Sequence, residues 1–222
     1  QRGARVIRSV EPHDSAERYS GLGVEVIEGT ATIVSPWEVD IVRNSGESER
    51  LSARSIVIAT GARPFIPPIP GIEAVGYFTS DTVWELRELP RRLLVLGGGP
   101  IGCELTQAFA RCGASVTQVQ HGPRIMVRED PEVSELVMQR FRAEGIAVLV
   151  NHEARKFVIE DGEKILVAEH QGQEVRIPFD ALLVAVGRVA NIAGYGLEEL
   201  GITAGRTIET NDFLQTKYPN IY

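Results

Sequence analysis

The sequence predicts an α/β fold in which a parallel sheet is combined with an antiparallel β-meander. The first observation is a run of four apolar residues, 93–96, that is followed by three glycines and then by helical periodicity. Such a run is typical of a buried parallel strand that turns sharply into a helix. The second observation is a set of three short β-rich runs with hairpin-like turns between them: 154–159, 164–169 and 174–177.

The composition is that of a globular protein, since 43% of the 222 residues are hydrophobic and 24% are charged. The net charge of −7 and the lack of a basic cluster argue against nucleic-acid binding. Every apolar run is interrupted before it reaches the length of a membrane span, and no secretory leader is recognisable. With two cysteines and no disulfide framework, we expect a cytoplasmic protein.

Before residue 72 the pattern predicts one short helix and several short strands. The helix is expected near Asp14 to Tyr19, and the proline-rich segment Arg63 to Gly71 is expected to be a stiff linker at a domain boundary. Four strands are expected between them: 24–27, 31–34, 38–42 and 55–61.

After the linker, helices and strands alternate, as a parallel sheet requires. Thr79-Ser80-Asp81 offers N-cap residues for a helix that would run to Leu89. Asp130-Pro131 opens another helix, and Gly145 closes it. Further strands are expected at 115–119, 146–150 and 181–186. The helix faces expected in the core carry Ile101, Leu105, Ala108 and Cys112, and then Val133, Leu136, Val137 and Phe141.

The turn after the strand at 93–96 carries the pattern G-x-G-x-x-G, at Gly97, Gly99 and Gly102. Gly97 permits the tight turn, Gly99 lets the backbone approach a pyrophosphate, and Gly102 lets the helix pack on its strand. The N–H groups at the start of the helix then face the phosphates. The pattern predicts a Rossmann-type domain that binds a dinucleotide at Gly97, Gly98, Gly99, Pro100, Ile101 and Gly102.

The residue at the end of the second strand bears on which dinucleotide binds. An acidic residue is expected there, about 20 residues after the glycine turn, where it bonds the ribose 2′-hydroxyl. This chain has Gln120, which is followed by His121, Arg124 and Arg128. An amide with cations nearby favours NADPH, because arginine is suited to binding phosphate. Gln120 can also hydrogen-bond a 2′-hydroxyl, so NADH stays open.

The chain also contains an internal repeat. A meander, an apolar strand and a glycine occur once ending at Ala59-Thr60-Gly61 and again ending at Ala185-Val186-Gly187. An arginine follows each glycine within two residues, as Arg63 and Arg188. Two nucleotide-binding halves of similar build would produce this repeat; two unrelated buried strands are the alternative.

Four motifs together resemble class I pyridine nucleotide–disulfide oxidoreductases, the family of dihydrolipoamide dehydrogenases, mercuric reductases and glutathione reductase. They are GGGPIGCE (97–104), VTQVQ (116–120), ATG (59–61) and AVGR (185–188). The resemblance covers nearly the whole chain and implies an FAD domain that is interrupted by an NAD(P) domain. On this map, residues 1–72 and 189–222 belong to the FAD domain, and residues 73–188 form the NAD(P)-binding domain.

The resemblance also implies roles for single residues. Glu104 would help to place the nicotinamide ring against the flavin, and Gly187 and Arg188 would lie near both rings. Ala59, Thr60 and Gly61 would contact FAD. Pro100 stands where several relatives carry an aromatic lid over the flavin. For Glu104 the alternative is an exposed carboxylate that the helix dipole favours.

The family's activity would be hydride transfer from NAD(P)H to FAD in a homodimeric parent, with electrons passed on to a disulfide or another acceptor. The first FAD-binding glycine turn, the Cys-x4-Cys pair, the Gly-Asp flavin contact and the dimerisation domain are missing from this sequence. We therefore expect a fragment that binds NAD(P)H, holds no FAD by itself and is inactive alone. The final acceptor stays open between mercuric ion, lipoamide, another disulfide and a quinone.

Two other functions are alternatives to this one. A short-chain dehydrogenase needs a Tyr-x3-Lys pair, and none of the five tyrosines has lysine four residues later. A non-catalytic NAD(P)-binding or sensing module would keep the glycine turn without the redox elements, and it remains the alternative.

The cysteines and histidines predict neither a redox pair nor a metal site. Cys103 and Cys112 are nine residues apart on one predicted helix, about 13 Å along its axis, which exceeds the reach of a disulfide. We expect both to be small buried side chains. The histidines have no metal-ligand spacing: His13, His121, His152 and His170.

Overall fold

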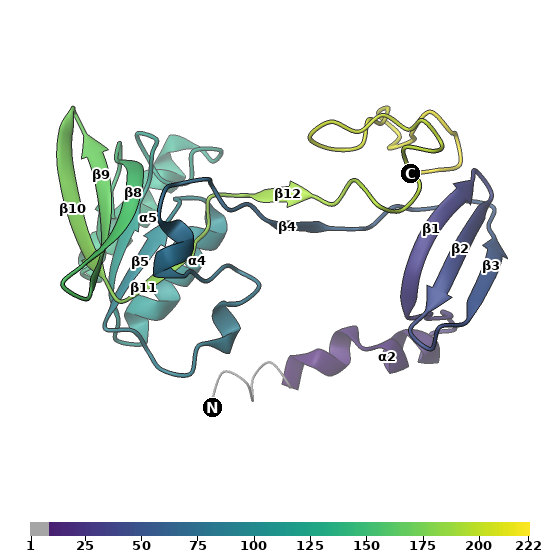
Figure 1. Ribbon diagram of the computed structural model, residues 1–222, viewed down its shortest axis with the longest axis horizontal. Coiled ribbons are helices and arrows are strands. Elements are labelled where there is room, and N and C mark those ends of the chain that lie inside the picture. The colour runs from purple at the N-terminus through teal and green to yellow at the C-terminus, as the bar shows by residue number, and fades with distance from the viewer. Residues whose placement is uncertain (1–8) are drawn as a thin grey trace. The chain divides into compact units, whose positions relative to one another are not determined.

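The computed structural model describes residues 9–222, so the first eight residues of the predicted segment 1–72 lie outside the described part. The chain divides into two compact units, one with residues up to Arg63 and Val189–Tyr222, the other with Pro64–Arg188 (Figure 1). The segments β4 (Ala62–Pro64) and β12 (Arg188–Ala190), where the chain passes from one unit to the other, form a two-stranded sheet. Within residues 9–222 there is no helix of the length and apolarity needed to cross a membrane.

The second unit begins at Pro64, and the NAD(P)-binding domain was predicted to begin at residue 73 within it. The proline-rich segment is part of this unit because it packs on it: the backbone N–H of Phe157 donates to the carbonyl of Pro70 at 2.8 Å. Ile72, at the start of α3 (Ile72–Val75), is buried in the same core. The segment is therefore part of a folded domain as well as a connection.

The first unit is built on an antiparallel sheet of order β1-β2-β3. Its strands are β1 (Gly29–Ser35), β2 (Glu38–Arg43) and β3 (Ser48–Ser52), and they follow the 3-10 turn η1 (Glu11–Asp14) and helix α2 (Ala16–Gly21). Ser15 caps α2, because its hydroxyl accepts a hydrogen bond from the backbone N–H of Arg18 at 3.3 Å. The core of this unit is formed by Ile33, Ile56, Leu197, Ile202 and Ile221.

Three sequence predictions in this unit are wrong. Residues 24–27 form no strand, and β3 is a strand that the sequence did not indicate, because its polar residues carry little β propensity. β3 forms through its pairing with β2. In place of the predicted strand 55–61, Ile56 forms an isolated parallel bridge with Ile221, and backbone hydrogen bonds join this segment to the one that ends in Tyr222.

The second unit contains a four-stranded parallel sheet of order β11-β5-β6-β7, which confirms the predicted α/β class. Its strands are β5 (Arg92–Leu96), β6 (Ser115–Val119), β7 (Ala147–Leu149) and β11 (Ala181–Val184). Helices α4 (Pro100–Arg111) and α5 (Pro131–Ala143) connect the strands β5, β6 and β7. The predicted meander is the antiparallel sheet β10-β9-β8, with β8 (Glu153–Glu160), β9 (Glu163–His170) and β10 (Gln173–Phe179).

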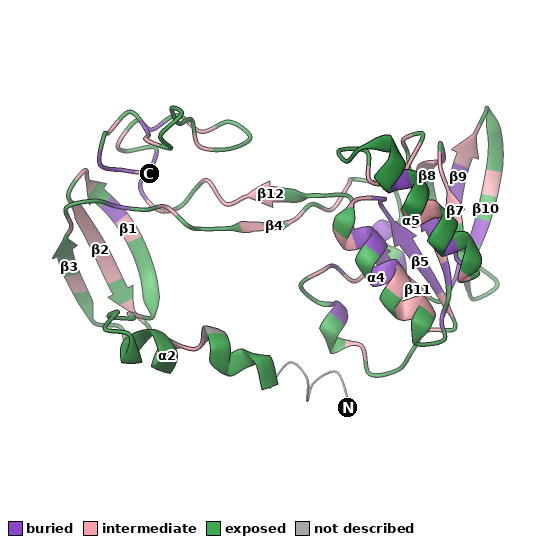
Figure 2. Ribbon diagram, turned by 180° about the vertical axis from the view of Figure 1, so that it is seen from behind, coloured by how far each residue is buried: buried purple, intermediate pink, exposed green. Residues whose placement is uncertain are grey.

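The parallel sheet lies between two layers, and its alternating side chains enter both. Leu94 and Leu96 of β5 pack with Phe157 and Leu166 of the antiparallel sheet. Leu93 and its strand neighbours on the same face pack with α4 instead. Burial on both faces explains the uninterrupted apolar run of β5, and the buried residues in Figure 2 are concentrated on these strands.

The predicted helix from residue 79 to Leu89 is wrong. Only the 3-10 turn η2 (Val83–Glu85) forms there. The hydroxyl of Thr82 accepts from the backbone N–H of Thr79 at 3.0 Å, and the hydroxyl of Thr79 accepts from the N–H of Asp81 at 3.2 Å. Short polar side chains thus satisfy the backbone locally, which competes with helix formation.

The buried faces of both long helices also differ from the prediction. Leu105 and Phe141 are buried as expected, but Ala108, Cys112 and Val133 are exposed, and Leu136 is 68% exposed. The faces that enter the core carry polar or small residues at several positions: Gly102 and Thr106 in α4, and Ser134 in α5. A prediction from apolar residues alone therefore assigns a partly wrong face of each helix to the core.

Candidate functional site

The glycine turn follows β5, and close contacts within the protein explain why two of its residues are glycine. At Gly97, with φ 113°, a Cβ would lie 2.3 Å from the carbonyl oxygen of Ala185. At Gly102 a Cβ would lie 2.4 Å from the carbonyl oxygen of Gly97. Both distances are far below van der Waals contact, so the packing of strand, turn and helix explains glycine at these two positions.

Gly99 is different, because no contact with residues 9–222 requires glycine there. Its φ of −77° and ψ of 179° are open to any residue, and a Cβ would have no heavy atom within 4 Å. Gly99 is also the N-cap residue of α4, and no side chain caps this helix. The backbone at Gly99 thus faces open space at the point where a phosphate would approach.

The first turn of α4 offers hydrogen-bond donors to that space. The first bond of the helix runs from the backbone N–H of Cys103 to the carbonyl of Gly99 at 2.9 Å, so the amides before Cys103 precede the helical ladder. Pro100 opens the helix, and its first turn holds no acidic residue. This end of α4 is therefore suited to an anion. Glu104 is exposed on the next turn.

The end of β6 reaches the glycine turn through Gln120. The side-chain oxygen of Gln120, Oε1, accepts a hydrogen bond from the backbone N–H of Gly98 at 2.9 Å. A backbone N–H can only donate, so this bond fixes the orientation of the amide and leaves the Nε2 group directed elsewhere. Gln120 presents a donor group to its surroundings, while its acceptor is committed to the turn.

The three predicted cations near Gln120 have different roles in the structure. Arg124 uses its guanidinium within its own loop: it donates to the carbonyls of Val127 and Glu129, each at 2.9 Å, and to that of Met126 at 3.3 Å. The same loop touches the glycine turn, because the N–H of Met126 donates to the carbonyl of Gly98 at 2.6 Å. The side chains of His121 and Arg128 are exposed.

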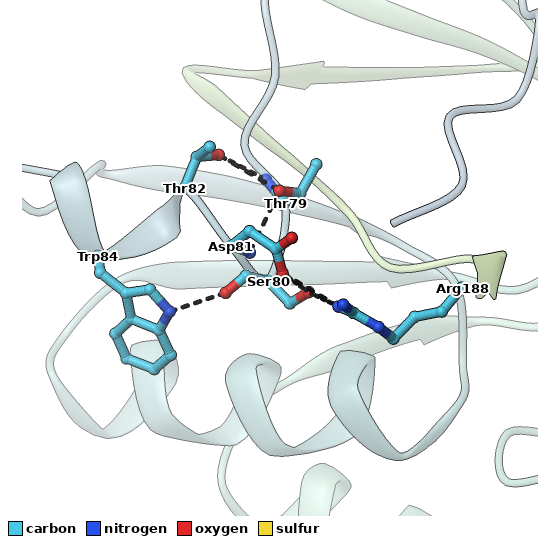
Figure 3. Close-up of polar contacts among 6 residues, drawn as sticks. All are labelled: Thr79, Ser80, Asp81, Thr82, Trp84 and Arg188. Atoms are coloured by element: carbon cyan, nitrogen blue, oxygen red, sulfur yellow. Dashed lines mark hydrogen bonds and ion pairs between the residues drawn. The ribbon is translucent and has the colours of Figure 1, made fainter. Parts of the chain in front are cut away.

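Gly187 and Arg188 follow β11, and the chain just before them passes beside the glycine turn. A Cβ at Gly97 would also lie 3.0 Å from the Cα of Val186. The guanidinium of Arg188 reaches the turn at Ser80 and Asp81, where Nη1 lies 3.0 Å from both the Ser80 hydroxyl and Asp81 Oδ1 (Figure 3). The hydrogen bond from Arg188 lowers the pKa of Asp81. The AVGR segment is thus held at the edge of the glycine-turn region.

The turn around Ser80 is itself braced by an indole group. Nε1 of the exposed Trp84 donates to the carbonyl of Ser80 at 2.7 Å (Figure 3). Ser80, Asp81 and Trp84 were predicted only as part of a helix, because no local pattern connects them with Arg188, more than 100 residues away.

The predicted FAD-contacting residues lie in the other unit. Ala59, Thr60 and Gly61 are exposed. The Thr60 hydroxyl donates to the carbonyl of Asn191 at 2.8 Å, and Nδ2 of Asn191 donates back to the carbonyl of Thr60 at 2.9 Å. Asn191 is a residue that the sequence analysis missed, and it fixes the conformation of this exposed turn.

The structure corrects the account of the cysteines and adds to that of the histidines. Cys103 is buried, which raises the pKa of its thiol, but Cys112 is exposed at the end of α4. His152 and His170 form a stacked pair with ring centroids 4.2 Å apart, and each Nδ1 lies at hydrogen-bond distance from a backbone carbonyl. Among residues 9–222, no three histidine, cysteine or acidic side chains are placed to hold a metal ion.

Gln118 is the most informative residue that the sequence analysis missed. It is fully buried in β6, and its Nε2 donates to the carbonyl of Gly97 at 2.9 Å. A glutamine inside an apolar strand is the signal that could have found it, because a buried amide is costly unless it is hydrogen-bonded.

Comparisons with known proteins agree on one family. The family model described as "Pyridine nucleotide-disulphide oxidoreductase" matches residues 6–222. Mercuric reductase from Streptomyces lividans is 38% identical over 216 residues, which cover 93% of this chain and 45% of that protein. The HOCl-induced flavoprotein disulfide reductase RclA from Escherichia coli, solved as a Cu(II) complex, has a TM-score of 0.77 at 29% identity over 89% of this chain and 44% of its own.

A third comparison supports the fold alone. LpdA from Mycobacterium tuberculosis has a TM-score of 0.84 at 23% identity and covers 99% of this chain and 50% of its own. The chain therefore spans half or less of the length of these relatives.

Proposed function

Because the chain belongs to the pyridine nucleotide-disulphide oxidoreductase family, we propose that it binds NAD(P)H at the glycine turn between β5 and α4. In the whole protein this nucleotide would deliver hydride to a flavin, which would pass electrons on to an acceptor. One of the solved relatives is named a flavoprotein disulfide reductase, and one of the curated relatives is named for the reduction of mercury. A mercuric ion is one candidate acceptor, beside a disulfide, lipoamide or a quinone.

The observation that carries the proposal is the open backbone at Gly99. Gly97 and Gly102 are explained by the packing of the protein, but Gly99 has an ordinary conformation and no neighbour within 4 Å of a Cβ position. A phosphate that approaches the amides of the first turn of α4 supplies the missing reason for glycine at this position. The lack of an acidic residue in that turn agrees with an anionic ligand.

The other predicted residues would act around this centre. Glu104, exposed on the second turn of α4, would help to place the nicotinamide ring. Gly187 and Arg188 would lie beside that ring, because the chain before them runs past Gly97. The exposed turn Ala59-Thr60-Gly61 would contact the flavin, and a Cβ at Gly61 would have no neighbour within 4 Å. When bound, the flavin would supply the hydride acceptor.

We propose NADPH as the preferred nucleotide. Oε1 of Gln120 is committed to the N–H of Gly98, so Nε2 is the part of the amide that can meet the ribose. An N–H donor suits phosphate oxygens, whereas a carboxylate at this position would repel them. Because Arg124 holds its own loop, the exposed Arg128 would supply the positive charge, with the exposed His121 beside Gln120.

The test is a side-by-side titration of the 222-residue chain with NADPH and NADH, followed by nucleotide fluorescence. We expect tighter binding of NADPH. In Gln120→Glu the carboxylate can still accept from Gly98, but the donor is replaced by a negative charge, so the preference should move toward NADH. Tighter binding of NADH by the unaltered chain would contradict the NADPH preference, and binding of neither nucleotide would contradict the site.

A further inference from the structure

One polar side chain in the second unit is buried where the surrounding strand residues are apolar. Gln118 lies in β6, an interior strand of the parallel sheet, opposite Val95 of β5 and Val148 of β7. Its side chain has no exposed surface. Burying an amide in such a place costs free energy unless the amide makes hydrogen bonds, so its presence indicates a specific hydrogen-bond partner.

Gln118 has two hydrogen-bond partners, the carbonyl of Gly97 in the glycine turn and, at 3.6 Å, the Sγ atom of Cys103 in α4. Its Nε2 donates to the carbonyl oxygen of Gly97 at 2.9 Å, and Oε1 of Gln120 accepts from the N–H of Gly98 at 2.9 Å. That oxygen and that N–H belong to the same peptide group. Gln118 lies in β6 and Gln120 directly follows its end, and residues two apart along an extended segment point to the same side, which is why both glutamines can reach one peptide.

We propose that Gln118 is a positioning residue for nucleotide binding, and that together with Gln120 it fixes the plane of the Gly97–Gly98 peptide. This inference rests on the proposed function. The orientation of that peptide sets the path of the chain into Gly99 and hence the direction of the amides that would meet the phosphates. Glycines on both sides of the peptide remove the restriction that a Cβ would place on its plane, and the two glutamine side chains hold its own carbonyl and N–H groups.

The two amides define one orientation of the peptide. If the peptide rotated by half a turn while both side-chain amides kept their observed orientation, its carbonyl would face Oε1 of Gln120, and its N–H would face the donor Nε2 of Gln118. Acceptor would then meet acceptor and donor would meet donor, which removes both hydrogen bonds. The pair therefore selects the observed plane, and the role at position 118 needs a donor, which a carboxylate or an apolar side chain cannot supply.

A purely structural role does not explain Gln118 well. Its Oε1 is buried without a hydrogen-bond partner among the described residues, and the same holds for the hydroxyl of Thr106 in α4. An unsatisfied buried oxygen destabilises the fold, so an unbranched apolar side chain of similar length would be tolerated as well or better. The free-energy cost of burying Oε1 is explained if Gln118 holds the glycine turn in its orientation.

The experiment compares Gln118→Met with the unaltered 222-residue chain, measuring thermal stability and the dissociation constants of NADPH and NADH by fluorescence titration. Methionine keeps the length of the side chain and removes the donor. We expect both affinities to fall by a similar factor, on the order of tenfold, as the loss of one hydrogen bond to the turn allows. The ratio of the two affinities and the melting temperature should stay unchanged, or the melting temperature should rise.

Two further variants make the result specific. Gln118→Leu repeats the loss of the donor in a different shape and should give the same pattern. Gln139→Met places the same substitution on the exposed face of α5 and should change neither affinity. Unchanged affinities in Gln118→Met would overturn the proposal, and so would a fall in melting temperature that accounts for the loss of binding.

A readout without nucleotide separates this inference from the proposed function. In Gln118→Met the amide of Gly98 should exchange with solvent faster than in the unaltered chain, measured by NMR, because the peptide is held on one side only. Unchanged exchange at Gly98 would refute the fixing of the peptide. If the unaltered chain bound neither nucleotide but the exchange changed as expected, the proposed function alone would fail.

Discussion

Replacing Gly99 by alanine should separate binding from folding. The backbone at Gly99 has φ −77°, and a Cβ there would meet no heavy atom within 4 Å. Alanine is a poorer N-cap than glycine but also restricts the unfolded chain, and these effects of up to about 1 kcal/mol oppose each other. We therefore expect the melting temperature of Gly99→Ala to stay within roughly 4 °C of the unaltered chain.

The affinity for NADPH should nevertheless fall. The new methyl group would occupy the space through which a phosphate approaches the first turn of α4. Loss of one hydrogen bond between a backbone amide and a charged group costs about 1.5–3 kcal/mol, which corresponds to a roughly 10- to 150-fold weaker dissociation constant.

Gly102→Ala is the matched control, because alanine at this position is expected to lower the stability of the fold directly. Its Cβ would lie 2.4 Å from the carbonyl oxygen of Gly97, about 1 Å inside ordinary contact. Overpacking of this kind costs about 1–3 kcal/mol, and the better helix propensity of alanine returns at most about 1 kcal/mol. This variant should lose stability, and any loss of binding would follow from the displaced turn.

The assay is a thermal unfolding curve and a fluorescence titration with NADPH on each variant. Undiminished binding by Gly99→Ala would refute the reasoning, because the open space would then have no connection with a ligand. A large fall in its melting temperature would also refute it, since the structure shows no contact for the methyl group.

Three further predictions concern stability and reactivity. Arg111 and other hydrogen-bond donors lower the pKa of Glu144 from 4.5 to about 2, so its contribution to stability is present above pH 4.5 and is lost as the pH falls toward 2. The melting temperature of Glu144→Gln should therefore lie below that of the unaltered chain at pH 7, and an equal gap at pH 2 would contradict this. Cys112 is exposed, so a thiol reagent should modify one cysteine rapidly in the folded chain and the second only after unfolding; two fast reactions would speak against the buried position of the second thiol. Phe141→Ala should cost about 3–5 kcal/mol of unfolding free energy in a denaturant titration, whereas Leu136→Ala on the same helix should cost less than about 0.5 kcal/mol. Equal costs would mean that α5 is turned differently.

The sequence alone was sufficient for the features that depend on local pattern. The apolar run that became β5 and the hairpin runs that became β8, β9 and β10 were predicted at nearly their observed positions. A strand that is buried on both faces has an uninterrupted run of apolar residues, and a strand that is buried on one face has apolar residues at alternate positions. The G-x-G-x-x-G spacing likewise predicted a turn from strand to helix, and α4 begins at Pro100 as expected.

Local pattern was insufficient where a polar side chain had a choice between several hydrogen-bond partners. Thr79 and Thr82 closed a turn where N-cap residues predicted a helix, because the same hydroxyls can serve either structure. The orientation of α5 depends on Ser134, whose hydroxyl donates to the carbonyl of Ile125 at 2.8 Å. Apolar periodicity contains no information about such a bond.

At the candidate site, the sequence determined which residues are present, and the tertiary structure decided what each one does. Gln120 was expected near the ribose, and the structure adds that its side-chain oxygen accepts from the N–H of Gly98, which leaves the nitrogen for other contacts. Arg124 was expected to meet a phosphate, but its guanidinium is used by the carbonyls of its own loop. The physical reason is that hydrogen-bond donors and acceptors are paired by position in space, and residues more than 20 positions apart, such as Gly97 and Gln118, come together only when the sheet has formed.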